Sequence, residues 1–375
     1  MAQHYLHSKE SRNFARTINK LTENEAEEWF AVARWGDKEQ QACPKCGVFR
    51  KHYRRSKSKR WRCAETECGY EFSVTSRTPF QSHKLSHRDL IQLILVFENG
   101  AKSRSLLEAS RCLGFTPKTI QANFGKIREW MVRNMDLKRL SGIVHMDGGY
   151  FGGKPRKPNR RTKMPKDALK IRFGTKVPKD PEKPWIEAGM TRKNWFKRFD
   201  KRVVMSLCES AGHGGGVKRV MAFVCRSESE SVAKTLVERF ISEDAILMTD
   251  EGNGFARLNG MVEHYTVRHA EEYVTSEGVS DNMCETFYSR MRRSEYGTLH
   301  GFRPKYLQDY TCEFVWRHNM RRHSQTDRVD QIISGLMASP PSTWWRGYWQ
   351  GRHREGEIGL EYFLARMLQG GDAAP

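Results

Sequence analysis

Apolar positions in the second half of this chain follow two different periods, and the change between them separates strands from helices. Runs typical of buried strands cover residues 143–151, 202–209, 217–226, 245–250 and 263–268. Amphipathic helical periodicity covers residues 229–241, 280–293 and 304–320. Three successive strands followed by alternating helices and strands predict an α/β fold with a mixed five-stranded sheet.

The first half of the chain predicts helices on both sides of a small cysteine-containing segment. Residues 1–40 are helical and partly amphipathic, and a helical block runs from Ser86 to Asn134, with its second helix starting at Ser103. That helix ends at Gly114, and the next begins with Thr116 as its cap and a proline at its first position. This arrangement resembles a helix-turn-helix, for which an ordinary three-helix packing module is the alternative.

The last helix of this block is the expected reader of DNA, because its first turns carry polar side chains. Four of them are placed to reach base edges: Lys118, Thr119, Gln121 and Asn123. Two cations further along the helix are placed to contact backbone phosphates: Lys126 and Arg128. We therefore expect residues 80–138 to form a DNA-binding domain.

Four of the nine cysteines form two pairs with the spacing of a zinc site. Cys43 and Cys46 are separated by two residues, and Cys63 and Cys68 by four. Four thiolates complete the tetrahedral coordination of zinc, so we expect a structural zinc ribbon within residues 41–75. A disulfide pair is the alternative. The other five cysteines are scattered through apolar segments, which is typical of a reducing compartment.

The charge of the chain points to a polyanionic partner. Lysine and arginine outnumber aspartate and glutamate by 65 to 44, which gives the 375-residue chain a net charge of +21. An excess of this size favours nucleic acid. A membrane partner is not expected, because no apolar run approaches the ~20 residues of a spanning helix. The N-terminus also lacks the apolar region of a signal peptide, so we expect a cytoplasmic protein.

The excess of basic residues is concentrated between residues 154 and 202. This segment carries 18 lysines and arginines against 5 acidic residues, and six prolines interrupt it. Prolines at this density predict irregular structure. The segment follows the strand that ends near Asp147, so we expect it to track phosphates there, with a solvated linker as the alternative.

Three acidic residues stand where a folded sheet can bring them together. Asp147 and Asp250 each end an apolar strand, and Glu285 lies on a later helix. Acids placed in this way can converge on a pair of divalent cations, which support phosphoryl transfer on nucleic acid. The glycines at 148 and 149 are expected to leave the backbone open to metal and substrate. Glu251 is interpreted as a cap or a surface charge, because adjacent strand residues point to opposite sides.

Three motifs, taken together, resemble a known family. They are HMDGGYFGGK at 145–154, MTDEGN at 248–253 and DNMCETFYSRMRR at 281–293, supported by residues 297–300 and 306–319. These motifs, in their order after the cysteine pairs, resemble the zinc-ribbon transposases of bacterial insertion sequences. That family belongs to the Asp-Asp-Glu (DDE) transposase and integrase superfamily, whose catalytic domain is ribonuclease H-like.

The resemblance implies a domain layout in which a ribonuclease H-like domain follows the ribbon and the helical domain. It would cover residues 140–322, with the basic insertion at 154–202, and a C-terminal appendage would cover 323–375. This appendage is rich in tryptophan and is interpreted as a packing element.

The resemblance also implies the roles of individual residues. Two Mg²⁺ or Mn²⁺ ions would be held by Asp147, Asp250 and Glu285, and phosphate would be bound by Arg292 and Arg293. The family often carries lysine at the position of one of these arginines. Its third acid can also be replaced by asparagine, so Asn282 is the alternative third ligand.

The implied function is that of a DNA transposase. It would bind the terminal inverted repeats of its element and catalyse metal-dependent cleavage and strand transfer on double-stranded DNA. Such enzymes act on two DNA ends, so a homodimer or a higher oligomer is expected. Two alternatives stay open: a non-enzymatic DNA-binding regulator derived from a transposase, and a metal-dependent nuclease without strand transfer.

Overall fold

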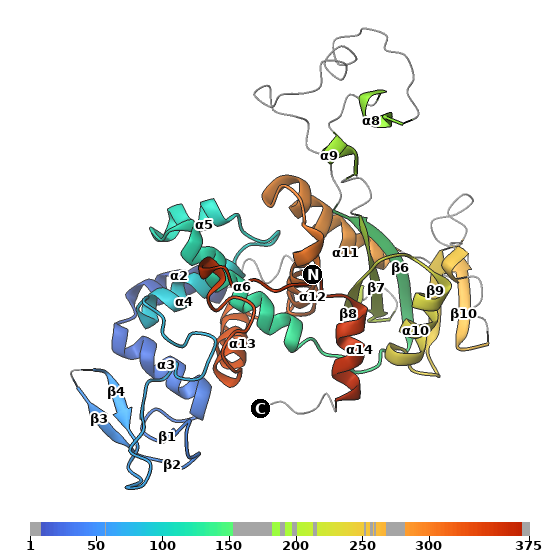
Figure 1. Cartoon of the computed structure of the whole chain (residues 1–375). Helices are drawn as coiled ribbons and strands as arrows, with labels where there is room; N and C mark the ends of the chain where they lie inside the picture. Colours follow the sequence, from blue (N-terminus) through green and yellow to red (C-terminus); the bar gives the residue numbers. More distant parts are fainter. Residues whose placement is uncertain are drawn as a thin grey trace. The chain divides into compact units, whose positions relative to one another are not determined.

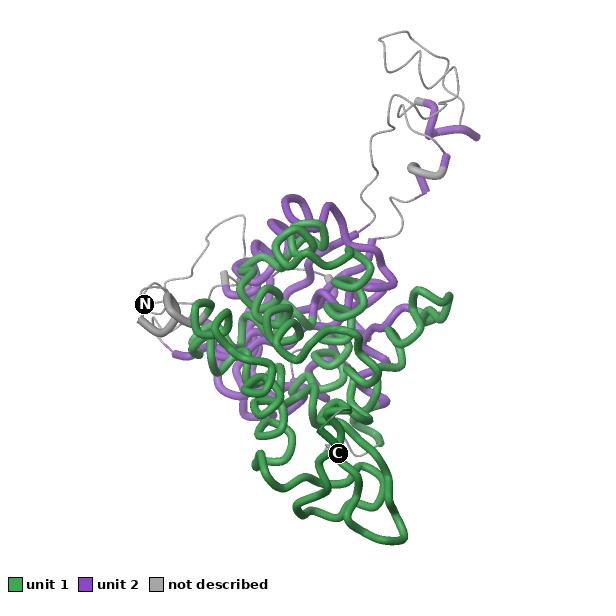
Figure 2. The backbone as a smooth tube through the Cα atoms, turned by 90° about the vertical axis from the view of Figure 1, so that its left-hand side faces the viewer, with its two compact units in different colours: residues 1–136, 312–356, 366–375 green, residues 137–311, 357–365 purple. Residues whose placement is uncertain are grey.

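The computed structural model describes residues 9–56, 58–152, 182–187, 192–196, 201–212, 216–250, 253–255, 258, 260–267 and 282–369. Contacts divide the chain into two compact units, which are coloured separately in Figure 2. Unit 1 comprises residues 1–136, 312–356 and 366–375, and unit 2 comprises residues 137–311 and 357–365. Both units are built from stretches that are far apart in the sequence. The domain boundaries expected from the sequence stay predictions.

Unit 2 contains the five-stranded sheet that the sequence predicts (Figure 1). The strands are β6 (Ile143–Phe151), β7 (Arg202–Ser210), β8 (Val217–Cys225), β9 (Ile246–Asp250) and β10 (Glu263–Val267). Their order in the sheet is β10-β9-β6-β7-β8. β6, β7 and β8 pair antiparallel, whereas β9 pairs parallel with both β6 and β10. This mixed sheet, with its helices, confirms the predicted ribonuclease H-like fold class.

Helices cover both faces of this sheet, because it carries buried apolar residues on both sides. They are α10 (Glu230–Phe240), α11 (Asn282–Arg293), α12 (Pro304–Asn319) and α14 (Leu360–Leu368). On one face, Phe223 of β8 stacks on Phe240 of α10 at 4.5 Å between ring centroids and contacts Phe363 of α14. On the other face, Tyr288 of α11 and Gln308 of α12 bond to the main chain of β7 and β8.

The ends of the five strands and of α10, α11 and α12 lie within two residues of the predicted ones, whereas α14 was not predicted. Between β9 and β10 the structure describes a short 3-10 helix, Asn253–Phe255, and residues 251, 252, 256, 257 and 259 lie outside the described residues.

Unit 1 is a helical body that carries a small ribbon. Its helices include α2 (Lys9–Lys20), α3 (Glu23–Trp35), α4 (His87–Glu98), α5 (Leu106–Leu113), α6 (Pro117–Arg133) and α13 (Gln325–Ala338). The predicted cap at Thr116 is present, since its hydroxyl accepts a bond from the Thr119 amide at 3.3 Å. α5 begins later than the expected Ser103, because Ser103 has a φ of +64°, which an α-helix does not allow.

α6 is the central helix of unit 1, because most of its side chains are buried. Two glycines let tryptophan rings approach closely. A Cβ at Gly335 of α13 would stand 2.2 Å from the ring of Trp130, and a Cβ at Gly125 would stand 2.1 Å from the ring of Trp345. Trp345 belongs to the tryptophan-rich C-terminal segment, which therefore packs on α6.

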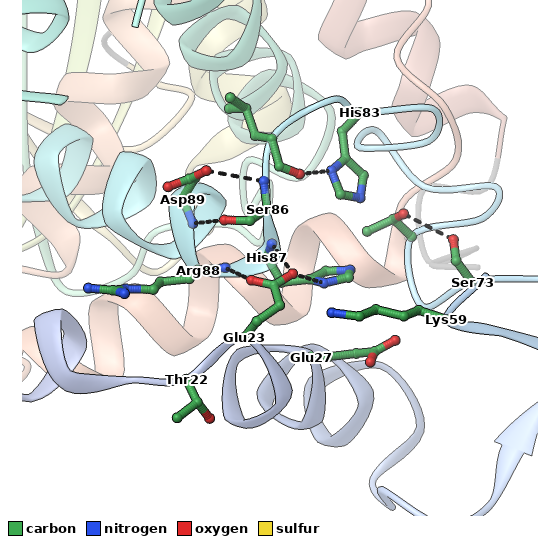
Figure 3. A network of polar contacts seen from close by, with 12 residues as sticks. Thr22, Glu23, Glu27, Lys59, Ser73, His83, Ser86, His87, Arg88 and Asp89 are labelled. Carbon is green, nitrogen blue, oxygen red and sulfur yellow. Dashed lines mark hydrogen bonds and ion pairs between the residues drawn. The ribbon is translucent and has the colours of Figure 1, made fainter. Parts of the chain in front are cut away.

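The first turns of α3 and α4 are joined by the partly exposed carboxylate of Glu23, shown in Figure 3. Glu23 accepts hydrogen bonds from the amides of His87 and Arg88 at 2.9 and 3.1 Å and contacts His87 Nδ1 at 2.8 Å. Burial opposes ionisation of Glu23, but these bonds outweigh it and lower its pKa. Ser86 and Asp89 complete a capping box at the start of α4. The acids at this joint are therefore structural.

Several expected features lie partly or wholly outside the described residues. Residues 1–8 and 370–375, most of the basic insertion and Glu251 are among them. The backbone of Asn282 is described as the first residue of α11, but its side chain is outside the description. Within the insertion the structure describes two short helices, α8 (Pro184–Glu187) and α9 (Arg192–Phe196).

Candidate functional site

The two predicted aspartates lie on adjacent parallel strands at matching heights. The register of β6 and β9 pairs His145 with Met248. The pairing ends there, and Asp147 and Asp250, the last residue of β9, each lie two residues beyond it on their strands. Both side chains are partly exposed. Neighbouring strands are about 4.8 Å apart, so carboxylates at matching positions can share a cation.

A side chain of α11 holds Asp147 in place through a hydrogen bond to the main chain of Asp147. The Tyr288 hydroxyl donates to the carbonyl oxygen of Asp147 and accepts a bond from the Ser206 amide at 3.2 Å. Burial, and then the charge of Asp147, raise the pKa of Tyr288 well above its usual value, so the hydroxyl keeps its proton. Oδ1 of Asp147 accepts a bond from the Gly148 amide at 2.6 Å. These contacts fix the position of the first acid.

α11 presents its predicted ligand and cations on the exposed side. Cys284, Phe287, Tyr288 and Met291 are buried against the sheet, and the Cys284 thiol donates to the carbonyl of His145 at 3.4 Å. Glu285, next to Cys284, is exposed. Arg292, two turns beyond Glu285, is also exposed, and its guanidinium lies 6.0 Å from the ring of Phe151. Arg293 is exposed beside it.

The chemistry of these donors fits a hard divalent cation, since carboxylate oxygens are the ligands that Mg²⁺ and Mn²⁺ prefer. The structure brings Asp147 and Asp250 to one place on the sheet and packs the helix of Glu285 against β6 and β7. Among the described residues, the four cysteines of the ribbon are the only group of three or more histidine, cysteine, aspartate or glutamate side chains whose ligand atoms lie within 4.8 Å of one another. The acids are therefore more widely spaced than the thiols.

A fourth carboxylate, Glu228, lies at the same place and was missed by the sequence analysis. It stands in the turn between β8 and α10, just before the Ser229 cap. Its Oε1 would lie 2.6 Å from a Cβ placed on Gly148, and it is hydrogen-bonded to Tyr150. Burial, and then the charge of Asp250, raise the pKa of Glu228. The position of Glu228 between a predicted strand and a predicted helix was the only sequence signal for this residue. Because polar residues are common in such loops, the signal did not distinguish Glu228 from an ordinary loop residue.

Gly148 and Gly149 have a different role from the one expected. Their backbone was expected to be open to metal and substrate, whereas protein side chains occupy the space beside both. Glu228 fills the space at Gly148, and the Tyr288 ring would lie 2.8 Å from a Cβ on Gly149. Consecutive strand residues point to opposite faces, so the two side chains approach β6 from opposite sides.

The four cysteines form a closed metal centre in unit 1. The Sγ atoms of Cys43 and Cys68 are 3.8 Å apart, and those of Cys46 and Cys63 are 3.6 Å apart. Four sulfurs about 2.3 Å from a central zinc are about 3.8 Å from one another. All nine cysteines are free, so the disulfide alternative is wrong. The cluster fits structural zinc and leaves no ligand position for catalysis.

The ribbon around this centre is built from short strands. They are β1 (Gln41–Ala42), β2 (Phe49–Arg50), β3 (Tyr53–Arg55), β4 (Arg60–Arg62) and β5 (Glu71–Phe72). Trp61 packs edge-on against Trp35 of α3 at 5.5 Å between ring centroids. Arg54 lies over the Trp61 ring at 4.2 Å and pairs with Glu27 of α3 at 2.6 Å. α3 therefore forms part of the support of the ribbon.

The polar residues of α6 are divided between the surface and the interior. Lys118 is exposed, with Nζ 5.0 Å from the Trp349 ring, and Thr119 and Gln121 are half-buried. Asn123 is buried, and its amide donates to the carbonyl of Thr119 at 3.0 Å. The predicted base contacts therefore differ in accessibility, and Lys118 is the most accessible of the four.

The two predicted phosphate contacts on α6 face the interior of unit 1. Arg128 is buried and pairs with Glu313 at 2.7 Å. Burial opposes the ionisation of Glu313, but Arg128 and Arg317 outweigh it and lower its pKa. Burial lowers the pKa of Lys126 to about 8, and its Nζ lies 5.8 Å from the Phe80 ring. Arg128 thus has a structural partner in place of a phosphate.

The last residue of the basic insertion lies on the sheet. Arg202, the first residue of β7, pairs with Phe151, the last residue of β6, which is four residues beyond Asp147. The first residue of the insertion, Lys154, lies outside the described residues. In its described part, Arg192 lies 5.6 Å from the ring of Trp185 and 5.8 Å from that of Phe196.

Comparison with known families gives two matches. Residues 139–319 match the ISXO2-like transposase domain. Residues 21–71 match the transposase zinc-ribbon domain, which begins early enough to include α3. Together the matches cover more than half of the chain. A search among curated proteins gave no match. Among the helices of the described residues, none has both the length and the apolar character needed to cross a bilayer.

Proposed function

Because this chain belongs to the zinc-ribbon insertion-sequence transposases of the Asp-Asp-Glu superfamily, we propose that it cleaves and joins DNA at the ends of its own element. The proposal includes binding of the terminal inverted repeats, cleavage in the presence of a divalent cation, and transfer of the freed strand to target DNA. The observation that carries it is the matched placement of Asp147 and Asp250 on adjacent parallel strands.

Each residue of the site has a role in this proposal. Asp147, Asp250 and Glu285 hold two Mg²⁺ or Mn²⁺ ions, with Asn282 as the alternative third ligand. Bound cations supply the activation of a water molecule and the stabilisation of the leaving oxygen. Tyr288 keeps Asp147 in place through its main chain. Arg292 and Arg293, exposed on the helix of Glu285, bind the phosphates that flank the scissile bond.

Unit 1 is proposed to recognise the element ends. Exposed aromatic and basic side chains gather on the strands of the ribbon: Phe49, Arg50, Tyr53, Arg55 and Arg60. Arginines of this kind contact phosphates, and aromatic rings pack on sugars and bases. Lys118 at the exposed start of α6 adds a further cation. Arg128 is assigned a structural role, since it is buried with Glu313.

The experiment is a cleavage and joining assay with the purified protein and labelled DNA that carries the inverted repeats of the element. With Mg²⁺ or Mn²⁺, we expect cleavage at the repeat ends and joining to a target duplex. Asp147→Asn and Asp250→Asn should each reduce cleavage by at least about a thousandfold, because either change removes a metal-binding charge. Binding of the repeats should survive both changes.

The alternatives predict different outcomes of the same assay. Binding without cleavage in either cation would support the regulator and contradict the proposal. Cleavage without joining would support the nuclease. Two DNA ends held together, measured by the mass of the protein–DNA complex, would support the expected dimer or higher oligomer.

A further inference from the structure

Trp349, in the tryptophan-rich C-terminal segment, lies against the exposed first turn of α6. Its indole nitrogen donates a hydrogen bond to the main-chain oxygen of Lys118 at 3.1 Å, and Nζ of Lys118 lies 5.0 Å from the centre of the indole ring. Trp349 is 45% exposed, and Lys118 is exposed as well. The C-terminal segment therefore contributes to the surface around the helix turn that is proposed to contact DNA.

Residues 346–352 form a compact loop, here called the C-terminal loop. Its centre is a 3-10 helix, Tyr348–Gln350, and a glycine on each side turns the chain. Gly347 has a φ of +77° and Gly351 a φ of +87°, which glycine adopts without strain. The amide of Arg352 donates to the carbonyl of Gly347 at 3.1 Å and closes the loop.

The C-terminal loop is anchored on the buried part of α6. The Trp345 ring, just before the loop, fills the space beside Gly125. The Tyr348 ring stacks on Trp345 at 4.6 Å between ring centroids. The Trp345 amide donates to the hydroxyl of Ser342 at 3.0 Å. These contacts place the loop on α6 before any partner binds.

Two exposed arginines of the loop add to the positive charge of Lys118. They are Arg346 and Arg352, and residues 342–354 contain no aspartate or glutamate. Within the described structure, Lys118 and these two arginines form no ion pair with an acidic side chain. Consecutive Cα atoms are 3.8 Å apart, so the two arginines, each three residues from Trp349, have Cα atoms within about 11 Å of its Cα. Duplex DNA carries one phosphate charge per about 1.7 Å of its axis, so these cations can contact one stretch of backbone.

We propose that the C-terminal loop and the first turn of α6 form one surface that binds the phosphate backbone of duplex DNA. Arg346 and Arg352 contact phosphates, and Trp349 is a positioning residue that directs Lys118 to the DNA. This inference rests on the proposed function, because it extends the DNA surface of unit 1 to a segment that neither family match covers. Phosphate contacts carry no sequence information, so the loop adds affinity and not recognition of the repeats.

The first test is the salt dependence of duplex binding by the full chain, measured by fluorescence anisotropy. One labelled duplex carries the element end, and a second of equal length has an unrelated sequence. We expect Arg346→Gln and Arg352→Gln each to reduce the salt slope by about one phosphate contact, and equally on both duplexes. Gln350→Ala changes an exposed, uncharged residue of the same loop and is the matched control, with binding unchanged.

A double-mutant cycle tests the positioning role of Trp349. Trp349→Ala should weaken DNA binding about as much as Lys118→Ala does, and should weaken it no further in a chain that already carries Lys118→Ala. A structural role that does not act through Lys118 predicts additive losses. Thermal unfolding shows whether Trp349→Ala folds, and if it does not, Trp349→Phe takes its place in the cycle, since it keeps a ring and removes the indole N–H.

The outcomes separate this inference from the proposed function. Unchanged salt slopes in both arginine variants would overturn the inference and favour an acidic protein as the partner of the loop, while cleavage by the unmodified protein would leave the proposed function standing. Losses confined to the element end would also overturn it, because they would indicate base recognition. Reduced slopes in a protein that binds DNA without cleaving it would support the inference and contradict the proposed function. No duplex binding by the unmodified protein would contradict both.

Discussion

Single residues of β6 show how an absent side chain can position a proposed metal ligand. At Gly149, the space that a Cβ would need is taken by the buried rings of Tyr288 and Phe151, at 2.8 and 3.0 Å. Because the ring lies this close, the Tyr288 hydroxyl reaches the main chain of Asp147. The strand is thereby tied to α11 at the residue that carries the first acid.

We therefore expect Gly149→Ala to destabilise the protein by about 1–3 kcal/mol, the usual cost of overpacking a tight interior. Cleavage should fall as well, because the displaced Tyr288 no longer holds Asp147. Urea unfolding measures the first effect, and the cleavage assay measures the second. Gly297→Ala is the control, since nothing lies within 4 Å of its Cβ position. Equal stability of the two variants would show that Tyr288 moves away without cost.

At the scale of the element, α6 combines the functions of a core helix and a surface helix. Its N-terminal turn is exposed around Lys118, whereas its middle is buried against α13 and the C-terminal tryptophans. Glu129 accepts hydrogen bonds from the main chain of Thr343 and Trp344 at 3.0 and 3.3 Å, which attaches the C-terminal segment. The exposed first turn is therefore the part of α6 that we propose to contact DNA.

Two alanine variants of α6 should affect different properties: one should lower stability, and the other should weaken DNA binding. Arg128→Ala removes one partner of the buried Glu313 and should destabilise the protein by about 3–5 kcal/mol. Lys118→Ala removes an exposed cation, and its stability should change by less than about 0.5 kcal/mol. DNA binding measured against salt concentration should show a shallower slope for Lys118→Ala, by about one phosphate contact. An unchanged slope would place the DNA elsewhere on unit 1.

At the scale of the whole molecule, two compact units carry metal sites of different chemistry. Thiolates bind zinc in unit 1, and carboxylates are proposed to bind Mg²⁺ or Mn²⁺ in unit 2. The ligands of each site come from one unit alone. Soft sulfur ligands select zinc, and hard oxygen ligands select the divalent cations of phosphoryl transfer.

Loss of metal binding at one site should therefore leave metal binding at the other unchanged. Cys63→Ser should lower the zinc content measured by elemental analysis and the affinity for the element ends, because zinc holds the ribbon folded. Its Mn²⁺ binding should stay unchanged. Asp147→Asn should show the reverse, with zinc retained and Mn²⁺ binding lost. Loss of Mn²⁺ binding in Cys63→Ser would show that the two units depend on each other.

The sequence by itself determined the strands of the five-stranded sheet, most of the helices and the identity of the zinc ligands. Strand and helix periods are local, and cysteine spacing limits the metal site that two turns can form, so both can be read without a fold. It also placed Asp250 at the end of its strand, because an apolar run that stops at an acid is visible in the chain, whereas Asp147 lies in the middle of β6, four residues before its end.

Only the tertiary structure decided which residues from distant segments meet. The approach of Glu228 to Gly148 joins positions 80 residues apart, and the pairing of Arg128 with Glu313 joins positions 185 residues apart. Neither leaves a local period, because packing between separate elements sets both. For the same reason Arg128 was predicted to meet phosphate and Glu228 was not predicted at all. Burial and neighbours, which the sequence does not display, gave each of them its role.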